Sequence, residues 1–121
     1  MTLREIQSEQ EIWSQKNFKE RHPEWAILGI TEELGELSHA VLKQEQGIRQ
    51  VKSEDEISLL ETDAVGDIIL FLMEFCNQRI NEQPEDDCRK QKYDIHTIIE
   101  ETWIKVRQRD WRKFPKNGTS E

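Results

Sequence analysis

Apolar residues recur along the chain at the spacing of helices, and no stretch of useful length alternates as a strand does. One stripe of a helix that turns about 100° per residue carries Ile27, Ile30, Leu34, Leu37 and Val41. The pattern predicts four helices: three over residues 2–16, 23–46 and 54–81, and a fourth that begins at 94 and whose region is closed by Pro115 and Gly118. We therefore expect an all-α fold, a helical bundle of about four helices.

Residues that favour helix ends stand at the expected boundaries. Thr2, followed three residues later by glutamate, has the form of a capping box. Pro23 suits a first helical turn, and Gly47 can adopt the left-handed conformation that ends a helix. Ser53 and Asp94 are N-cap residues for the third and fourth helices. Residues 48–53 are expected to form a loop.

The third helix is apolar on every side over residues 68–73, which predicts burial by more than its own neighbours. We therefore expect a homodimer or a tetramer built on this helix. The polar stretch 81–92 is expected to be a linker with little defined structure. In the fourth helix, Ile95, Ile99, Trp103 and Val106 form a stripe that is expected to dock on the core.

The length, charge and cysteine content of the chain limit the number of domains, the kind of partner and the compartment that we expect. With 121 residues we expect a single domain over residues 1–121, with an N-terminal helix in 1–20 and a basic tail in 111–121. A net charge of −8 argues against binding a nucleic-acid polymer. Two cysteines make no disulfide framework. There is no signal-peptide core or membrane-spanning run, so a cytoplasmic location and no membrane partner are expected.

Acidic residues supply the candidate chemistry. Glu32, Glu33 and Glu36 share one flank of the second helix, at the border of its apolar stripe. Asp63 and Asp67 lie about 40° apart on the third helix. An antiparallel hairpin can turn the two groups toward each other. Oxygen ligands of this kind suit Mg²⁺ or Mn²⁺.

These motifs resemble those of the MazG-like nucleotide pyrophosphohydrolases, all-α enzymes marked by Glu-Glu-x-x-Glu on one helix and Glu-x-x-Asp on the next. Residues 31–37 (TEELGEL) match the first half, and residues 63–68 (DAVGDI) resemble the second. The segments 42–49 and 109–111 extend the resemblance over most of the chain from Trp25 onward. The chain departs from the pattern at Ala64, where the family has glutamate, and Asp63 is the candidate replacement.

The resemblance implies a Mg²⁺-dependent hydrolase (Mn²⁺ is an alternative) that cleaves a nucleoside triphosphate into a monophosphate and pyrophosphate, a reaction suited to house-cleaning of the nucleotide pool. Glu33, Glu36 and Asp67 would be metal ligands, Asp63 the fourth, and Glu32 a further ligand or the group that orients the attacking water. The candidate substrate contacts are Lys43, Asn77, Arg109, Trp111 and Lys116.

Three alternatives remain open. One is a helical interaction module that has lost activity at Ala64, and another is a phosphoribosyl-ATP pyrophosphatase. The basic residues that follow Lys105 are also typical of a solubilising helix end rather than a phosphate clamp. Without the family resemblance, the acidic cluster itself would be read as a solvated helix face.

Overall fold

Helices dominate the structure, a computed structural model that describes residues 1–49 and 52–120. These residues form four α-helices and one 3-10 helix: α1 (Leu3–Asn17), α2 (Pro23–Gln46), α3 (Glu54–Glu82), η1 (Cys88–Tyr93) and α4 (Ile95–Val106). No strand occurs in them, so the predicted all-α class is confirmed. Residues 50 and 51 of the expected loop, and residue 121 of the expected tail, lie outside the described residues.

Most of the predicted helix ends are confirmed by local caps, but α4 ends at Val106, before Pro115 and Gly118, the predicted closing residues. The Thr2 hydroxyl accepts a hydrogen bond from the Glu5 N–H (3.1 Å), and the Glu5 carboxylate accepts one from the Thr2 N–H (2.9 Å). Gly47 ends α2 with φ at 68°. Ser53 and Asp94 each accept a hydrogen bond from the N–H three residues further on. Each cap satisfies a backbone group that the helix itself leaves unpaired.

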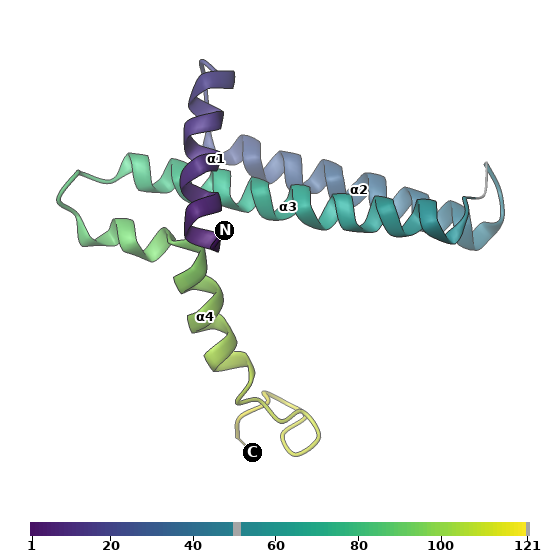
Figure 1. Cartoon of the computed structure of the whole chain (residues 1–121). Helices are drawn as coiled ribbons and strands as arrows, with labels where there is room; N and C mark the ends of the chain where they lie inside the picture. The colour runs from purple at the N-terminus through teal and green to yellow at the C-terminus, as the bar shows by residue number, and fades with distance from the viewer. Residues whose placement is uncertain (50–51, 121) are drawn as a thin grey trace.

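The helices α2 and α3 run side by side as a long hairpin, and α1 crosses this pair near the C-terminal half of α3 (Figure 1). Gly29 on α2 allows the close approach, since a Cβ at this position would lie 2.5 Å from the Phe71 ring on α3. The predicted hairpin is therefore present. It brings the acidic flank of α2 opposite the acidic flank of α3.

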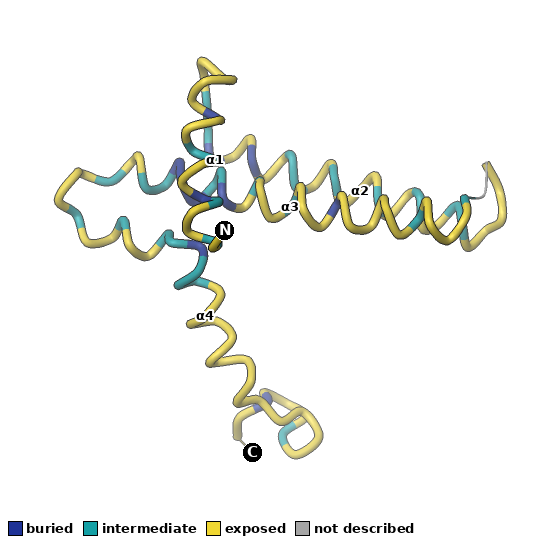
Figure 2. Tube along the Cα trace, in the orientation of Figure 1, coloured by how far each residue is buried: buried dark blue, intermediate teal, exposed yellow. Residues whose placement is uncertain are grey.

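The small core lies where α1, α3, η1 and the start of α4 meet. Met73, Cys76 and Ile95 are its buried residues, and Ile6 and Tyr93 pack against them. Most other large apolar side chains are exposed, as the yellow stretches of the hairpin and of α4 show (Figure 2). In the apolar run 68–73, Ile69, Leu70 and Leu72 are exposed, and only Met73 is buried in the single chain.

The prediction that α4 docks by its whole apolar stripe is wrong. Ile95 is buried, but Ile99 is 48% exposed and Trp103 58% exposed. The reason is the direction of α4, which leaves the core at its first turn and projects away from α2 and α3 (Figure 1). Among the described residues its base packs on α1 and η1, and Ile95 joins the core with Met73 and Cys76 of α3.

The prediction of a poorly structured linker over residues 81–92 is also wrong. The helix α3 continues to Glu82, and η1 occupies Cys88–Tyr93. Asp87 organises this polar segment, since its carboxylate accepts hydrogen bonds from the backbone N–H and the guanidinium of Arg89. Side-chain capping of this kind forms local structure without apolar periodicity. No helix in the described ranges combines the length and apolarity that crossing a bilayer requires.

Candidate functional site

Four of the five acidic residues singled out from the sequence line one hollow of about 240 Å³ between α2 and α3. Glu33 and Glu36 come from α2, and Asp63 and Asp67 from α3. Glu32 lies on the exposed side of α2 and does not line the hollow. The spacing within each pair, three or four residues, keeps both carboxylates on the flank that faces the other helix.

Negative charge accumulates in this carboxylate hollow without compensation. In residues 1–49 and 52–120, no ion pair or hydrogen bond is made by the side chains of Glu33, Glu36, Asp63 or Asp67. Partial burial, followed by the charges of Asp67 and Glu36, raises the pKa of Glu33 above its usual range. The four carboxylates therefore form a site at which a cation would be stabilised.

The donor chemistry of the hollow fits Mg²⁺, which prefers carboxylate oxygens and keeps several of its own waters. As the side chains stand, no three Asp, Glu, His or Cys residues of the described ranges converge on one point suited to a metal ion. Glu36, Asp63 and Asp67 are exposed, so their side chains have room to rotate toward a common point. Ala40 and Ala64, also in the lining, leave space for that rotation.

A larger cavity, of about 690 Å³, adjoins the carboxylate hollow. It lies between α1, the start of α2 and α3, and we call it the aromatic cavity after its lining residues Trp13, Phe18, His22, Trp25 and Phe71. The His22 and Trp25 rings lie 4.5 Å apart, and the Trp13 and Phe18 rings meet edge to face at 5.7 Å. Asp67 lines both spaces, so the aromatic cavity and the carboxylate hollow share one carboxylate.

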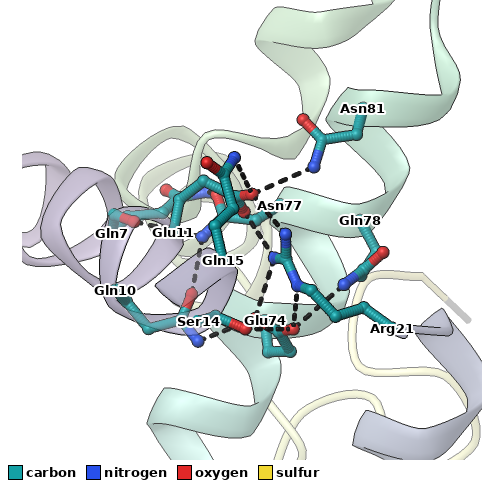
Figure 3. A network of polar contacts seen from close by, with 10 residues as sticks. All are labelled: Gln7, Gln10, Glu11, Ser14, Gln15, Arg21, Glu74, Asn77, Gln78 and Asn81. Carbon is teal, nitrogen blue, oxygen red and sulfur yellow. Dashed lines mark hydrogen bonds and ion pairs between the residues drawn. The ribbon is translucent and has the colours of Figure 1, made fainter. Parts of the chain in front are cut away.

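A polar network closes one wall of the aromatic cavity (Figure 3). The Arg21 guanidinium donates to both oxygens of Glu11, at 2.7 and 2.8 Å, and its Nε donates to Glu74 at 3.0 Å. Because Glu11 lies on α1 and Glu74 on α3, Arg21 ties these two helices together just before α2 begins. No side-chain polar atom fully buried within the described ranges lacks a hydrogen-bond partner.

Glu74 is saturated by this network. Besides Arg21, the side chains of Gln10, Ser14 and Gln78 donate to its two oxygens at 2.8–3.0 Å. Burial favours the neutral acid, but these hydrogen bonds outweigh it and lower the pKa of Glu74 to about 2. Glu74 therefore stays ionised and has no lone pair left for a ligand in the aromatic cavity.

Asn77, a predicted base or sugar contact, does not line the aromatic cavity. Its side-chain oxygen accepts from the Gln7 side chain at 3.1 Å, and its amide donates to the Gln7 carbonyl (3.1 Å) and to Gln10 (2.8 Å). Asn77 is buried and its amide is fully used. The structure makes it part of the junction between α1 and α3.

The other predicted substrate contacts lie outside both spaces of their own chain. Lys43 is in the last turn of α2, where its amine donates to Gln46 at 3.0 Å. Arg109, Trp111 and Lys116 belong to the segment that follows α4. None of these four residues lines the carboxylate hollow or the aromatic cavity.

Sequence reasoning did not find the aromatic cavity. Trp13 and Trp25 are 55% and 50% exposed and line this cavity. One signal was available, because Trp13, Phe18, His22 and Trp25 gather within 13 residues around the break between the first two helices. The cavity wall supplied by Phe71 and Glu74 comes from α3 and has no such local signal.

Comparisons of this chain with protein-family models, with curated proteins and with solved structures found no match. The resemblance to MazG-like enzymes, which came from the two acidic motifs, stays a prediction.

Proposed function

We propose that this protein is a Mg²⁺-dependent nucleoside triphosphate pyrophosphohydrolase, which cleaves a (d)NTP with water into a (d)NMP and pyrophosphate and serves in house-cleaning of the nucleotide pool. One observation carries the proposal: a hollow lined by four carboxylates adjoins an aromatic cavity and shares Asp67 with it. A nucleotide needs this pair of environments, a cation site for its phosphates and a flat apolar space for its base.

The size and lining of the aromatic cavity support this assignment. Its volume of about 690 Å³ falls within the range of small-molecule sites, roughly 300–1,000 Å³. Trp13, Trp25 and Phe71 offer ring faces for stacking, and each stacked base gains about 1–3 kcal/mol from such a contact. His22 lies among these rings as a hydrogen-bonding group for an edge of the base.

The reaction breaks the bond between the α-phosphorus and the oxygen that bridges to the β-phosphorus. Mg²⁺, when bound, would neutralise phosphate charge and help to activate the attacking water. Glu33, Glu36, Asp63 and Asp67 would hold the cation, since they line the hollow together. Glu32, on the outer flank, would orient the water or accept its proton.

Self-association belongs to the same proposal. The chain exposes 9571 Å², whereas a compact monomer of 14.5 kDa exposes about 6,900 Å². The excess, about 2,700 Å² per chain, is enough for an obligate interface, which covers roughly 2,000–5,000 Å² in total. We therefore propose a homodimer or a dimer of dimers, and light scattering that found a monomer at micromolar concentration would contradict it.

A substrate panel tests the enzymatic activity. The protein is incubated with canonical and damaged NTPs and dNTPs, and with phosphoribosyl-ATP, in Mg²⁺ or Mn²⁺, while monophosphate and pyrophosphate are measured. We expect both products in equal amounts from at least one nucleoside triphosphate. Turnover of phosphoribosyl-ATP alone would select the phosphoribosyl-ATP pyrophosphatase alternative, and no product from any compound would overturn the enzyme assignment.

Calorimetric titration with Mn²⁺ separates the enzyme from an inactive interaction module. We expect binding that is lost in Glu36→Gln and kept in Glu45→Gln, a matched change on the same helix outside the hollow. The interaction module instead predicts no binding that depends on Glu36.

A further inference from the structure

The C-terminal arm, which we define as α4 from Ile99 onward with residues 107–118, has an apolar face that stays exposed among the residues that the structure describes. Ile99 is 48% exposed, Trp103 58% and Val106 37%, and the three lie on one side of the helix. These side chains lie beyond the base of α4, which packs on α1 and η1 and whose Ile95 joins the core with Met73 and Cys76. An isolated helix of twelve residues is marginal in water, so this face needs a covering surface.

The base of the arm fixes its direction. Ile95 is buried, and its backbone N–H donates to the Gln7 side chain at 2.8 Å. Asp94 pairs with Arg4 at 3.0 Å while it caps α4. These contacts hold α4 pointing away from the α2–α3 hairpin (Figure 1). The arm therefore cannot fold back on its own carboxylate hollow without breaking the junction with α1.

The end of the arm is a closed loop rather than a frayed tail. The Asp110 N–H donates to the Gly118 carbonyl at 2.7 Å, and the Gly118 N–H donates to the Phe114 carbonyl at 2.8 Å. The Asp110 carboxylate accepts from the backbone N–H groups of Arg112 and Lys113. Gly118 is buried against Arg109 and Trp111. The loop thus presents its side chains on a preformed backbone.

The sign of charge reverses between this loop and the hairpin. Residues 107–120 carry one acidic residue and five basic ones, all exposed: Arg107, Arg109, Arg112, Lys113 and Lys116. Their charge of +4 leaves −12 for the rest of a chain with net charge −8. The hairpin holds most of the acids, because residues 23–46 contain five acidic residues against one basic, and residues 54–82 eight against one.

We propose that the C-terminal arm acts in trans: its apolar face packs on the hairpin of a second copy of this chain, and its cationic loop lies at the mouth of that copy's carboxylate hollow. The inference rests on the self-association and the phosphate chemistry proposed above. A second copy is the occupant that fits, since it offers both exposed apolar side chains on α2 and α3 and the opposite charge. Complementary charge of this kind fixes the register of an interface more than it adds affinity.

The proposed role of the loop is to bind the triphosphate. The carboxylates of the hollow repel a polyanion, and the cationic loop of the partner copy would offset that repulsion and contact phosphate oxygens through Arg109, Arg112 and Lys116. Each site would then be complete only in the dimer.

Cross-linking tests the geometry without any need for activity. In a Cys88→Ser background, which removes the exposed thiol, untagged Arg112→Cys chains are mixed with affinity-tagged His39→Cys chains and treated with a long flexible bismaleimide. His39 is exposed and lies three residues beyond Glu36 on α2. We expect tagged-to-untagged products, and several-fold less of them when Trp103→Ser is added. Lys16→Cys, on α1, replaces Arg112→Cys as the matched control.

Three outcomes would overturn the inference. The first is a monomer in which a His39→Cys/Arg112→Cys chain cross-links only to itself. The second is a dimer that yields only Arg112-to-Arg112 products. The third is a product that forms only after DNA is added, which would identify a nucleic acid as the partner of the loop.

If the protein hydrolyses a nucleotide, mixing two inactive variants gives a second test of whether the arm acts in trans. A Glu36→Gln chain keeps its arm and loses its hollow, whereas an Arg109→Ser/Arg112→Ser/Lys116→Ser chain keeps its hollow and loses its loop. An equal mixture of the two chains should regain about one quarter of wild-type activity, since random reassortment makes half of the dimers mixed and each mixed dimer has one complete site of its two. An arm that serves its own chain predicts no recovery. If no substrate is turned over, the cross-linking result still decides the placement of the arm.

Discussion

Glu74 and Asp67 lie two turns apart on α3, and both line the aromatic cavity, yet their surroundings are opposite. Glu74 accepts hydrogen bonds from Arg21 and from three uncharged side chains. Asp67 has three other carboxylates around its hollow and no cationic partner in the part of the chain that the structure describes. One helix thus carries a paired acid at its crossing with α1 and an unpaired acid in the hairpin.

The difference separates stability from function. A paired and hydrogen-bonded carboxylate lowers the free energy of the fold, and removing its partner leaves a costly charge. A cluster of like charges destabilises the fold unless a cation or ligand offsets it. We therefore expect substitutions near Glu74 to change the free energy of unfolding, and substitutions near Asp67 to change metal binding and turnover.

Glu36→Gln is expected to have the largest effect on function. It removes one charged oxygen from the carboxylate hollow and should lower turnover by at least about 100-fold, because the loss of groups that merely orient metal ligands already costs 10–100-fold. Initial rates of pyrophosphate release measure the effect, with Glu45→Gln as the control. Full turnover by Glu36→Gln would remove the hollow from the mechanism.

Asp63→Asn should reduce activity about as severely if Asp63 fills the place of the missing family glutamate. Ala64→Glu, added to Asp63→Asn, should then restore much of the activity, because Ala64 lines the same hollow. Rates at several Mg²⁺ concentrations separate a lost ligand, which excess metal partly rescues, from a lost catalytic group. If Asp63→Asn keeps its turnover while Asp67→Asn loses it, the site works without Asp63.

Arg21→Met tests the other side of the comparison. It leaves the carboxylates of Glu11 and Glu74 without their cationic partner, and should destabilise the fold by about 3 kcal/mol. Urea unfolding followed by circular dichroism measures the change. Arg79→Met, which breaks an exposed pair with Glu82 and a cation–π contact with Phe75, is the control and should shift the unfolding midpoint much less. Equal losses of stability in both variants would show that the Arg21 network stabilises the fold no more than an exposed ion pair does.

The same network predicts how stability depends on pH. The pKa of Glu74 is about 2 in the fold against an ordinary value of 4.5, and the pKa of Glu11 is lowered as well. At a pH between the folded and unfolded pKa values, the unfolded chain binds protons at these carboxylates and the folded chain does not. The stability that the two carboxylates contribute is therefore fully present above about pH 5 and is lost as the pH falls toward 2. We expect a loss of about 1–2 kcal/mol between pH 5 and pH 3.

Thermal unfolding across this pH range measures the loss. Glu74→Gln should remove much of the slope, and a slope that this variant leaves unchanged would place the cause elsewhere in the chain.

The smallest expected effect is a change in stability, and it compares Asp67 with Glu74 directly. Asp67→Asn should raise the stability of the metal-free protein by a few tenths of a kcal/mol, because it relieves repulsion between exposed like charges, whereas Glu74→Gln, on the same helix, should lower stability. Chemical denaturation in the presence of a chelator compares the two variants. A destabilised Asp67→Asn protein would show that Asp67 has a structural role that its exposed position does not reveal.

The sequence by itself determined the helices and most of their ends. Capping by Thr2, Ser53 and Asp94 and termination at Gly47 involve residues within a few positions of one another, so the signals are local and readable. The two acidic motifs were readable for the same reason, since spacings of three and four residues fix a shared flank. A short connection then sufficed to predict the hairpin that brings the two flanks together.

Only the tertiary structure decided which faces are covered and where a ligand fits. Asn77 is buried by Gln7, a residue 70 positions away, and the aromatic cavity is walled by helices from both halves of the chain. The apolar stripe of α4 follows the same rule, because periodicity states that a face is apolar but not whether anything in the chain covers it. Burial depends on the direction in which each helix leaves the core, and that direction is set by contacts between residues far apart in the sequence.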